Sequence, residues 1–294
     1  MKYRIVHKTE YVYEEPVTSC HNEAHLTPRA LPRQRVTSHA IDVEPKPATM
    51  SRRKDWFGNP VLYFAVQSAH PVLTVTARSF VERDDDDCRR YQRSTATWND
   101  VAARTRASVT PDGLDARQFL FDSPMLSASS EVRAYALPSF ADERPLLEAV
   151  AELTVRIHAD FGYEPGTTTI ATPLARVLAQ RSGVCQDFAH VAIACLRSMG
   201  LAARYVSGYL ETVPPPGKER LVGADASHAW CAVWDPDAGW LDFDPTNGDL
   251  ALGRHITTAW GRDYGDVTPM KGIIFGGGTS HTATVAVDVE PVAG

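Results

Sequence analysis

The 294-residue sequence contains no long hydrophobic run. No segment approaches the roughly 18 consecutive apolar residues that a membrane-spanning helix needs. Residues 1–10 mix charged and apolar side chains and so lack the continuous apolar stretch of a secretion signal. Both absences argue against a membrane partner, and we expect a cytoplasmic protein.

Paired cysteines and an excess of positive charge are also missing. The five cysteines are scattered and form no C-x-x-C pair, so neither a disulfide framework nor a zinc site is indicated. The net charge of −6 gives no support to nucleic-acid binding, and no loop of spaced acidic residues suggests calcium. We therefore expect no metal, no cofactor and no nucleic-acid partner, while a homo-oligomer is compatible with the sequence.

What is present indicates two folded parts. Hydrophobic residues make up 44% of the chain, enough for two cores. Residues 1–90 show strand-like alternation broken by proline turns, which predicts a β-sandwich-like domain. Residues 91–144 carry weak helical patterns and read as a connecting segment with short helices. In residues 145–294, helical patterns precede strand patterns, which is the α+β order of a catalytic core. The helices are expected at 145–159, 173–180 and 185–200, and the strands at 203–210, 228–234, 239–243 and 281–289.

One stretch, residues 181–200, combines a polar turn with an amphipathic helix. Its apolar side chains recur at steps of three and four, and Gly200 marks the helix end. Ser182 and Gly183 suit the turn before the helix, so Cys185 falls in the first turn. Unpaired N–H groups and the helix dipole favour an anion there, including a thiolate. Cys185 is therefore a candidate nucleophile, although a cysteine at this place is also a common small buried residue.

A predicted β-hairpin brings a histidine and an aspartate together. The runs 227–234 and 240–247 are joined by a short Pro/Asp/Gly turn. His228 opens the first strand and Asp244 closes the second, so both lie at the same end of the ladder. A carboxylate placed there fixes the tautomer and orientation of an imidazole.

Two other residues compete for these roles. Asp242 shares a strand face with Asp244, but Asp244 lies nearer the level of His228. His190 follows Cys185 by five residues and falls on a different helix face, so we interpret it as structural. Together, Cys185, His228 and Asp244 match the nucleophile, base and orienting acid of thiol acyl transfer.

These residues lie in segments that resemble the transglutaminase-like superfamily, whose members have a papain-like fold. The resemblance is carried by Gly183–His190, Ala202–Tyr209, Ser227–Trp230, Trp240–Asn247 and Gly261–Tyr264. Residues 1 to about 83 resemble the N-terminal β-rich domain of bacterial members that are provisionally described as cysteine proteases. Three N-terminal segments carry that likeness, namely Tyr3–Thr9, Thr27–Arg29 and Phe57–Pro60.

The resemblance implies that Cys185 is the nucleophile, His228 the general base and acid, and Asp244 the residue that orients it. Animal crosslinking members carry an oxyanion-binding tryptophan upstream of the nucleophile, whereas here none lies nearer than Trp98. Tyr163 and Gln186 are the candidate substitutes for that donor.

We expect hydrolysis of an amide or peptide bond in a peptide or protein substrate, through a thioester. The alternatives are transamidation with an amine acceptor, or a non-catalytic peptide-binding or assembly module on a papain-like core.

Overall fold

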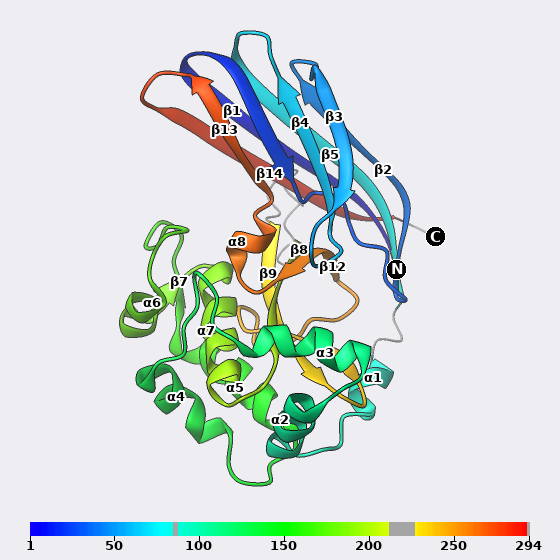
Figure 1. Ribbon diagram of the computed structural model, residues 1–294, viewed down its shortest axis with the longest axis vertical. Helices are drawn as coiled ribbons and strands as arrows, with labels where there is room; N and C mark the ends of the chain where they lie inside the picture. The colour runs from blue at the N-terminus through cyan, green and yellow to red at the C-terminus, as the bar shows by residue number, and fades with distance from the viewer. Residues whose placement is uncertain (85–87, 212–226, 293–294) are drawn as a thin grey trace, which may run out of the picture.

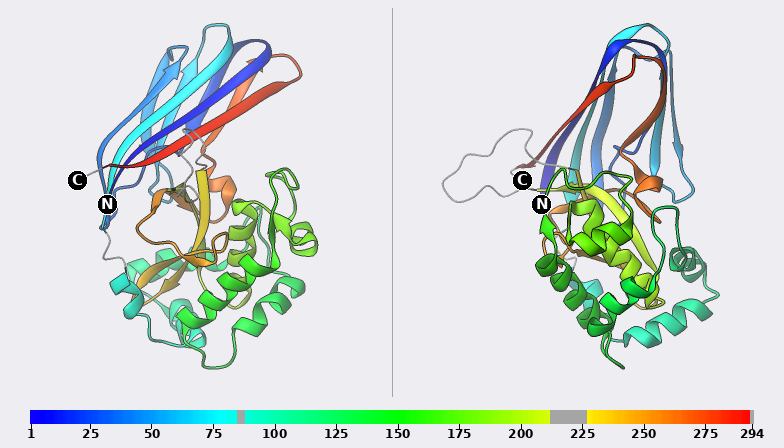
Figure 2. Two further views of the ribbon diagram at one scale, coloured as in Figure 1. Left: turned by 180° about the vertical axis from the view of Figure 1, so that it is seen from behind. Right: turned by 90° about the vertical axis from the view of Figure 1, so that its left-hand side faces the viewer.

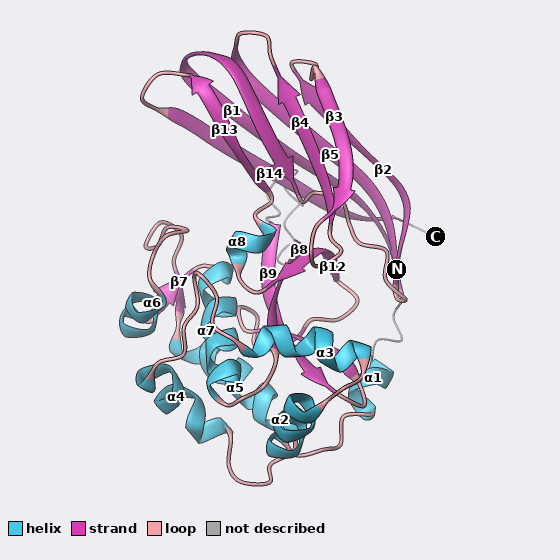
Figure 3. Cartoon of the chain, viewed as in Figure 1, coloured by secondary structure: helices cyan, strands magenta, loops and turns pink. Residues whose placement is uncertain are grey.

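The structure is a computed structural model and describes residues 1–84, 88–211 and 227–292. An antiparallel sheet stands at one end of the molecule and a mixed helical and β part at the other (Figures 1 and 3). This arrangement confirms the predicted α+β class with a β-rich N-terminal domain.

The first sheet is organised around β1 (Lys2–Ala24), a strand of 23 residues. Residues 2–12 of β1 pair with β5 on one side and β14 on the other, while residues 17–24 pair with β4 and β13. The sheet has seven strands, and its halves enclose a hydrophobic cluster that includes Val17, Phe64 and Val75. The other strands of this sheet are β2 (Gln34–Glu44), β3 (Thr49–Lys54), β4 (Pro60–Val66), β5 (His70–Arg83), β13 (Met270–Gly276) and β14 (His281–Val292).

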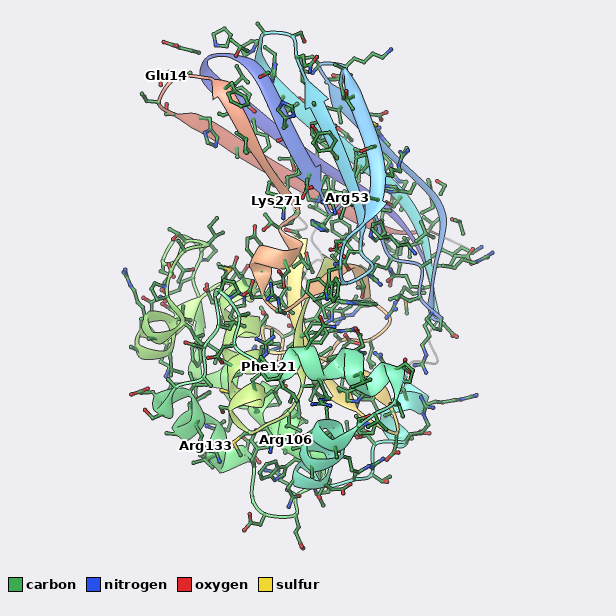
Figure 4. All side chains as sticks on the ribbon, viewed as in Figure 1. Glu14, Arg53, Arg106, Phe121, Arg133 and Lys271 are labelled. Carbon is green, nitrogen blue, oxygen red and sulfur yellow. The ribbon has the colours of Figure 1, made fainter. Side chains whose placement is uncertain are left out.

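The end of the chain differs from the predicted division, which placed residues 145–294 together in the catalytic core. Both β13 and β14 pair with β1, and Lys2 lies opposite Val292. The physical reason is the length of β1, because each half of that strand would otherwise present unpaired N–H and C=O groups at an edge. Figure 4 shows Glu14 at the far tip of this sheet, where its carboxylate accepts hydrogen bonds from Thr279 and Ser280 in the β13–β14 turn. The remaining boundaries stay a prediction.

Helices make up most of the second part. The predicted helices at 145–159, 173–180 and 185–200 correspond to α5, α6 and α7, and the expected connecting segment folds into short helices. Side chains of that segment, among them Val101 and Val132, join the same hydrophobic cluster as α5 and α7. The helices are α1 (Cys88–Gln92), α2 (Trp98–Ala107), α3 (Pro111–Arg117), α4 (Ser130–Ala136), α5 (Leu146–Asp160), α6 (Leu174–Gln180), α7 (Cys185–Ser198) and α8 (Tyr264–Val267), with 3-10 turns η1 (Gln118–Leu120) and η2 (Leu137–Ser139).

A second antiparallel sheet of five strands, in the order β11-β10-β9-β8-β12, backs these helices (Figure 1). One face carries side chains such as Tyr205, Cys231 and Phe243, which pack in the cluster that contains α7. The strands are β8 (Ala203–Leu210), β9 (Ser227–Asp235), β10 (Gly239–Asp244), β11 (Asp249–Leu250) and β12 (His255–Gly261). A short parallel pair, β6 (Gly162–Tyr163) with β7 (Ser182–Gly183), precedes α7.

The two sheets are joined at β12, an edge strand of the second sheet, which lies just below the first sheet (Figures 1 and 2). The Asn59 amide accepts from the N–H of Trp260 at 3.0 Å and donates to its carbonyl at 2.8 Å. The Gln34 amide does the same to Thr257, at 2.9 and 2.7 Å. Two side-chain amides thus continue the ladder of β12 in place of a neighbouring strand, and one continuous cluster of apolar residues, including Tyr3 and Ile256, is buried beside them.

Among the described residues, none of the helices has both the length and the apolar character needed to cross a bilayer.

Candidate active site

The entry to α7 is built to present Cys185, the first residue of that helix. Val184 is extended before it, and the Val184 N–H donates to Asp187 Oδ2 at 2.9 Å. Thr168 donates to the same oxygen at 2.7 Å. Gly183 is required by this arrangement, because a Cβ at that position would lie 2.5 Å from Asp187 Oδ2. The first turn of the helix is therefore fixed by a buried carboxylate rather than by Ser182.

This capping has a chemical consequence for the N–H groups of the first turn. The first N–H groups of any helix have no intrahelical acceptor. Asp187, the third residue of the helix, accepts the N–H of Val184, the residue just before the helix, which leaves the N–H groups of Cys185 and Gln186 at the positive end of the helix. That end is suited to hold a thiolate or a developing oxyanion.

The predicted hairpin is present, and it brings His228 and Asp244 into contact. The β9–β10 register pairs Phe243 with Cys231, so Asp244 ends β10 beside the beginning of β9. His228 Nε2 lies 2.7 Å from Asp244 Oδ2. The competing acid, Asp242, has other partners, since it forms an ion pair with Arg90 at 2.8 Å.

Asp244 is fully buried and saturated with hydrogen-bond donors. Its Oδ2 atom is contacted by His228 Nε2, by Asn247 Nδ2 at 2.6 Å and by His255 Nε2 at 2.9 Å. Its Oδ1 atom accepts the backbone N–H groups of Thr246 at 3.0 Å and Asn247 at 3.2 Å. Burial alone would raise the pKa of Asp244, but the donated hydrogen bonds outweigh it and hold the pKa far below its usual range.

His228 connects Asp244 to the thiol. Burial acts to lower the pKa of His228, but hydrogen bonds and charge interactions with Asp244 and Cys185 prevail and raise it to about 10. Because Nε2 is occupied by Asp244, the hydrogen bond with Cys185 falls to Nδ1. The structure thus brings Cys185, His228 and Asp244 together in one chain of contacts that favours the protonated form of the imidazole.

Three tyrosines surround the thiol. Burial is the main cause that raises the pKa of Tyr163, Tyr205 and Tyr264, and Cys185 contributes to each rise. Tyr205 is buried in the core, whereas Tyr163 on β6 is 53% exposed and so is accessible to a substrate. Gln186, the other predicted donor, is the second residue of α7. Among the described residues, the structure gives its side chain no hydrogen bond to Cys185, His228 or Asp244.

His190 lies on the buried side of α7. Its Nε2 atom accepts a hydrogen bond from the Tyr264 N–H at 3.2 Å, and burial lowers the pKa of His190 to about 4. The imidazole therefore holds the start of α8 in place, at the Gly261–Tyr264 segment.

Sequence reasoning missed His255. This residue opens β12, a strand whose pattern was not recognised, and the sequence alone offers no signal that places it beside Asp244. Its Nδ1 atom is buried and has no partner among the described residues. His228, Asp244 and His255 place one ligand atom each within 4.8 Å of one another. Two imidazoles and a carboxylate can ligate zinc. Here both imidazoles hydrogen-bond to the Asp244 carboxylate. The absence of a metal stays a prediction.

Comparisons with known proteins match both parts of the chain. Residues 3–82 match the model of the bacterial transglutaminase-like N-terminal region, and residues 133–245 match that of the transglutaminase-like superfamily. The uncharacterised protein Rv2569c of Mycobacterium tuberculosis is 45% identical over all of this chain and 94% of its own length. The uncharacterised protein ML0607 of Mycobacterium leprae is 37% identical over 99% of each chain.

A crystal structure from Cytophaga hutchinsonii, provisionally named a cysteine protease, superimposes with a TM-score of 0.76. The match covers 99% of this chain and 90% of that one at 19% identity, and so shows the shared fold. The superfamily model spans Cys185, His228, Asp244 and the whole of α7. The chain belongs to the transglutaminase-like superfamily, and its core follows a bacterial transglutaminase-like N-terminal region.

Proposed function

We propose that the protein is a cysteine-dependent acyl-transfer enzyme that hydrolyses amide or peptide bonds. The observation that carries the proposal is the contact chain of Cys185, His228 and Asp244, at the N-terminus of α7. A protonated His228 beside the thiol favours the thiolate, and the positive end of the helix adds to that effect. Membership of the superfamily supports the same roles.

In the first half of the reaction, the Cys185 thiolate attacks the carbonyl carbon of the substrate. The oxyanion that forms is held by the backbone N–H groups of Cys185 and Gln186, with the Tyr163 hydroxyl as a candidate side-chain donor. His228 gives its proton to the leaving amine, the C–N bond breaks and a thioester remains on Cys185.

In the second half, His228 is neutral and accepts a proton from the attacking water. The thioester C–S bond breaks, the carboxylic acid leaves, and the thiolate and imidazolium are restored. Asp244 keeps the imidazole ring oriented and its charge compensated in both halves. No step requires a metal or cofactor.

An amine in place of water would give transamidation, and one comparison favours keeping this second function. A protein-glutamine gamma-glutamyltransferase of Pseudomonas aeruginosa is 35% identical over 94 residues, which are 29% of this chain and 14% of that protein. We favour hydrolysis because free crosslinking activity would act on neighbouring proteins.

The test is the rate of Cys185 alkylation by iodoacetamide between about pH 5 and pH 9, with labelled peptides identified by mass spectrometry. Cys88 is exposed and serves as an internal control. We expect Cys185 to react at pH 6 much faster than Cys88, by about tenfold or more, and His228→Ala to abolish this difference. Equal rates for the two thiols in the wild type would contradict the proposal and favour a non-catalytic binding module.

The acceptor is tested separately. Glutamine-containing peptides are incubated with the protein, and ammonia release is measured with and without a primary amine. Hydrolysis predicts ammonia release or peptide cleavage without the amine, whereas an absolute need for the amine would establish transamidation instead. Cys185→Ala should be inactive in both assays.

A further inference from the structure

A cavity that does not include the thiol lies against the face of the second sheet that is turned away from α7. Its volume is about 500 Å³, within the range of small-molecule sites. Its lining includes four tryptophans, Trp230, Trp234, Trp240 and Trp260, but neither Cys185 nor His228. The proposed function uses none of these indoles.

The floor of this tryptophan-lined cavity contains a buried cation, Arg204 on β8, which is 7% exposed. Its guanidinium stacks on Trp260 at 3.8 Å and on Trp240 at 4.1 Å from the ring centroids. Within the described parts of the chain, the structure gives Arg204 no hydrogen bond and no ion pair, and its Nε is buried without an acceptor. A buried guanidinium normally has a carboxylate or phosphate partner, because desolvation of an unpaired charge is costly.

Two rings in the lining, those of Trp234 and His255, also carry buried polar nitrogens. The Trp234 Nε1–H is a buried donor without an acceptor among the described residues. His255 is 6% exposed, and its Nδ1 atom is likewise without a partner there. Because His255 Nε2 faces the Asp244 carboxylate, its proton lies on Nε2 in the neutral ring and Nδ1 is an acceptor. The cavity lining therefore includes a buried cation, an N–H donor and a ring-nitrogen acceptor among the indoles, together with four further arginines, Arg33, Arg83, Arg90 and Arg93.

In the described parts of the chain, no acidic residue of the lining forms a hydrogen bond or ion pair with Arg204, although the charges of Asp242 and Asp115 act on it from a greater distance. Asp242 forms its ion pair with Arg90, and Asp115 accepts a hydrogen bond from Gln118 at 2.7 Å. Asp112 and Asp115 are exposed at the rim on α3. An occupant thus meets exposed acids and the exposed Arg93 at the rim, and a buried guanidinium with no hydrogen-bond partner among the described residues.

We propose that this cavity binds a small aromatic carboxylate. The carboxylate pairs with Arg204, the ring lies among the indoles, and an N–H or O–H on the ring donates to His255. A guanidinium fork matches a planar carboxylate in geometry as well as charge. The site does not depend on the proposed reaction, but His255 connects it to Asp244.

The test is calorimetric titration of the full chain with 2-aminobenzoate and with 2-aminobenzamide, two probes that differ in charge at one group. We expect 2-aminobenzoate to bind at least about tenfold more tightly, because only it can form the charged pair. Arg204→Met should remove that preference, whereas Arg93→Met, at an exposed lining position, should change the affinity by less than about threefold. Equal affinities, no binding up to about 10 mM, or an unchanged Arg204→Met protein would each overturn the proposal.

Arg204→Met removes two stacking contacts and so can unfold the protein, which circular dichroism would reveal. Trp234→Phe is the second variant, because it keeps an aromatic wall and removes only the N–H donor. We expect it to weaken 2-aminobenzoate binding by about threefold to tenfold. No weakening in a folded Trp234→Phe protein would contradict the position given to the ligand. Each titration is repeated in Cys185→Ala, where binding should persist even if the protein has no enzymatic activity.

Discussion

At the scale of single residues, Asp244 is shared between two imidazoles. His228 and His255 both contact its Oδ2 atom, at 2.7 and 2.9 Å. Only His228 also contacts Cys185. Burial lowers the pKa of His255, although Asp244 opposes the change, so the ring is neutral and donates to Asp244. His255 therefore orients the carboxylate that in turn orients His228.

The first prediction concerns this positioning role. In His255→Gln, Asp244 keeps its donors from His228, Thr246 and Asn247, so we expect the Cys185 alkylation rate at pH 6 to fall by only about threefold to tenfold. The pH profile should also shift toward higher pH, since a less firmly held Asp244 supports the imidazolium less well. His281→Gln, on the exposed first sheet, is the matched control. An unchanged pH profile in a folded His255→Gln protein would show that the imidazole of His255 does not help to orient Asp244.

The sequence predicts the grouping of Cys185, His228 and Asp244, but it does not predict that His255 joins them. A local pattern is enough to place Cys185 at a helix start and to bring His228 and Asp244 together across a short turn. His255 lies on β12, which pairs with β8, and the partner residues on β8 lie 45 or more positions earlier. Such pairing leaves no periodic signal in the chain, so His255 could not be identified before the fold was known.

At the scale of elements, contacts with β12 give a structural role to two of the N-terminal segments that carry the family resemblance. Thr27–Arg29 and Phe57–Pro60 lie in loops of the first part, yet their side chains contact the second sheet. Asn59 pairs with the backbone of Trp260, and the Arg29 guanidinium lies 3.5 Å from the centroid of the Trp260 ring. These two motifs therefore encode a contact with the transglutaminase-like part of the chain rather than a feature of the first sheet alone.

The second prediction tests that contact. Asn59 is completely buried, and Asn59→Ala would leave the Trp260 N–H and carbonyl without partners. We expect the free energy of unfolding to fall by about 2–4 kcal/mol, measured by urea titration with tryptophan fluorescence. Gln67→Ala, at an exposed turn of the same sheet, should change it by less than about 0.5 kcal/mol. A loss for Asn59→Ala no larger than that of the control would show that water replaces the amide at this edge.

Helices and hairpins follow from local sequence, whereas the membership of a sheet does not. The predicted helices begin within one residue of α5, α6 and α7, and the hairpin strands agree equally well. In contrast, β13 and β14 join β1, which lies more than 240 positions earlier in the chain. Their own residues alternate like any strand, and only the two unpaired halves of β1 explain where they pack.

At the scale of the whole molecule, the interface between the sheets contains a buried histidine. His7 on β1 is 1% exposed. One ring nitrogen lies 3.1 Å from the Tyr209 hydroxyl of the second sheet and the other 3.0 Å from Thr9 Oγ1. Burial lowers the pKa of His7 to about 4, so the ring is neutral in the folded protein at physiological pH.

The third prediction follows from this shift. Below the ordinary pKa of about 6.5, the unfolded chain binds a proton at His7 that the folded protein binds only near pH 4, so stability falls with pH across that window. His190, whose pKa burial also lowers to about 4, acts in the same direction. The raised pKa of His228 opposes both, because the folded protein already holds that proton when the unfolded chain takes one up.

We expect His7→Gln to reduce the loss of unfolding free energy between pH 7 and pH 5 by on the order of 1–2 kcal/mol, measured by urea unfolding at each pH. His7 connects the two sheets. If the sheets can unfold independently, we therefore expect His7→Gln to split the unfolding curve into two transitions. A single transition that shifts as a whole would show that the interface makes them one cooperative unit.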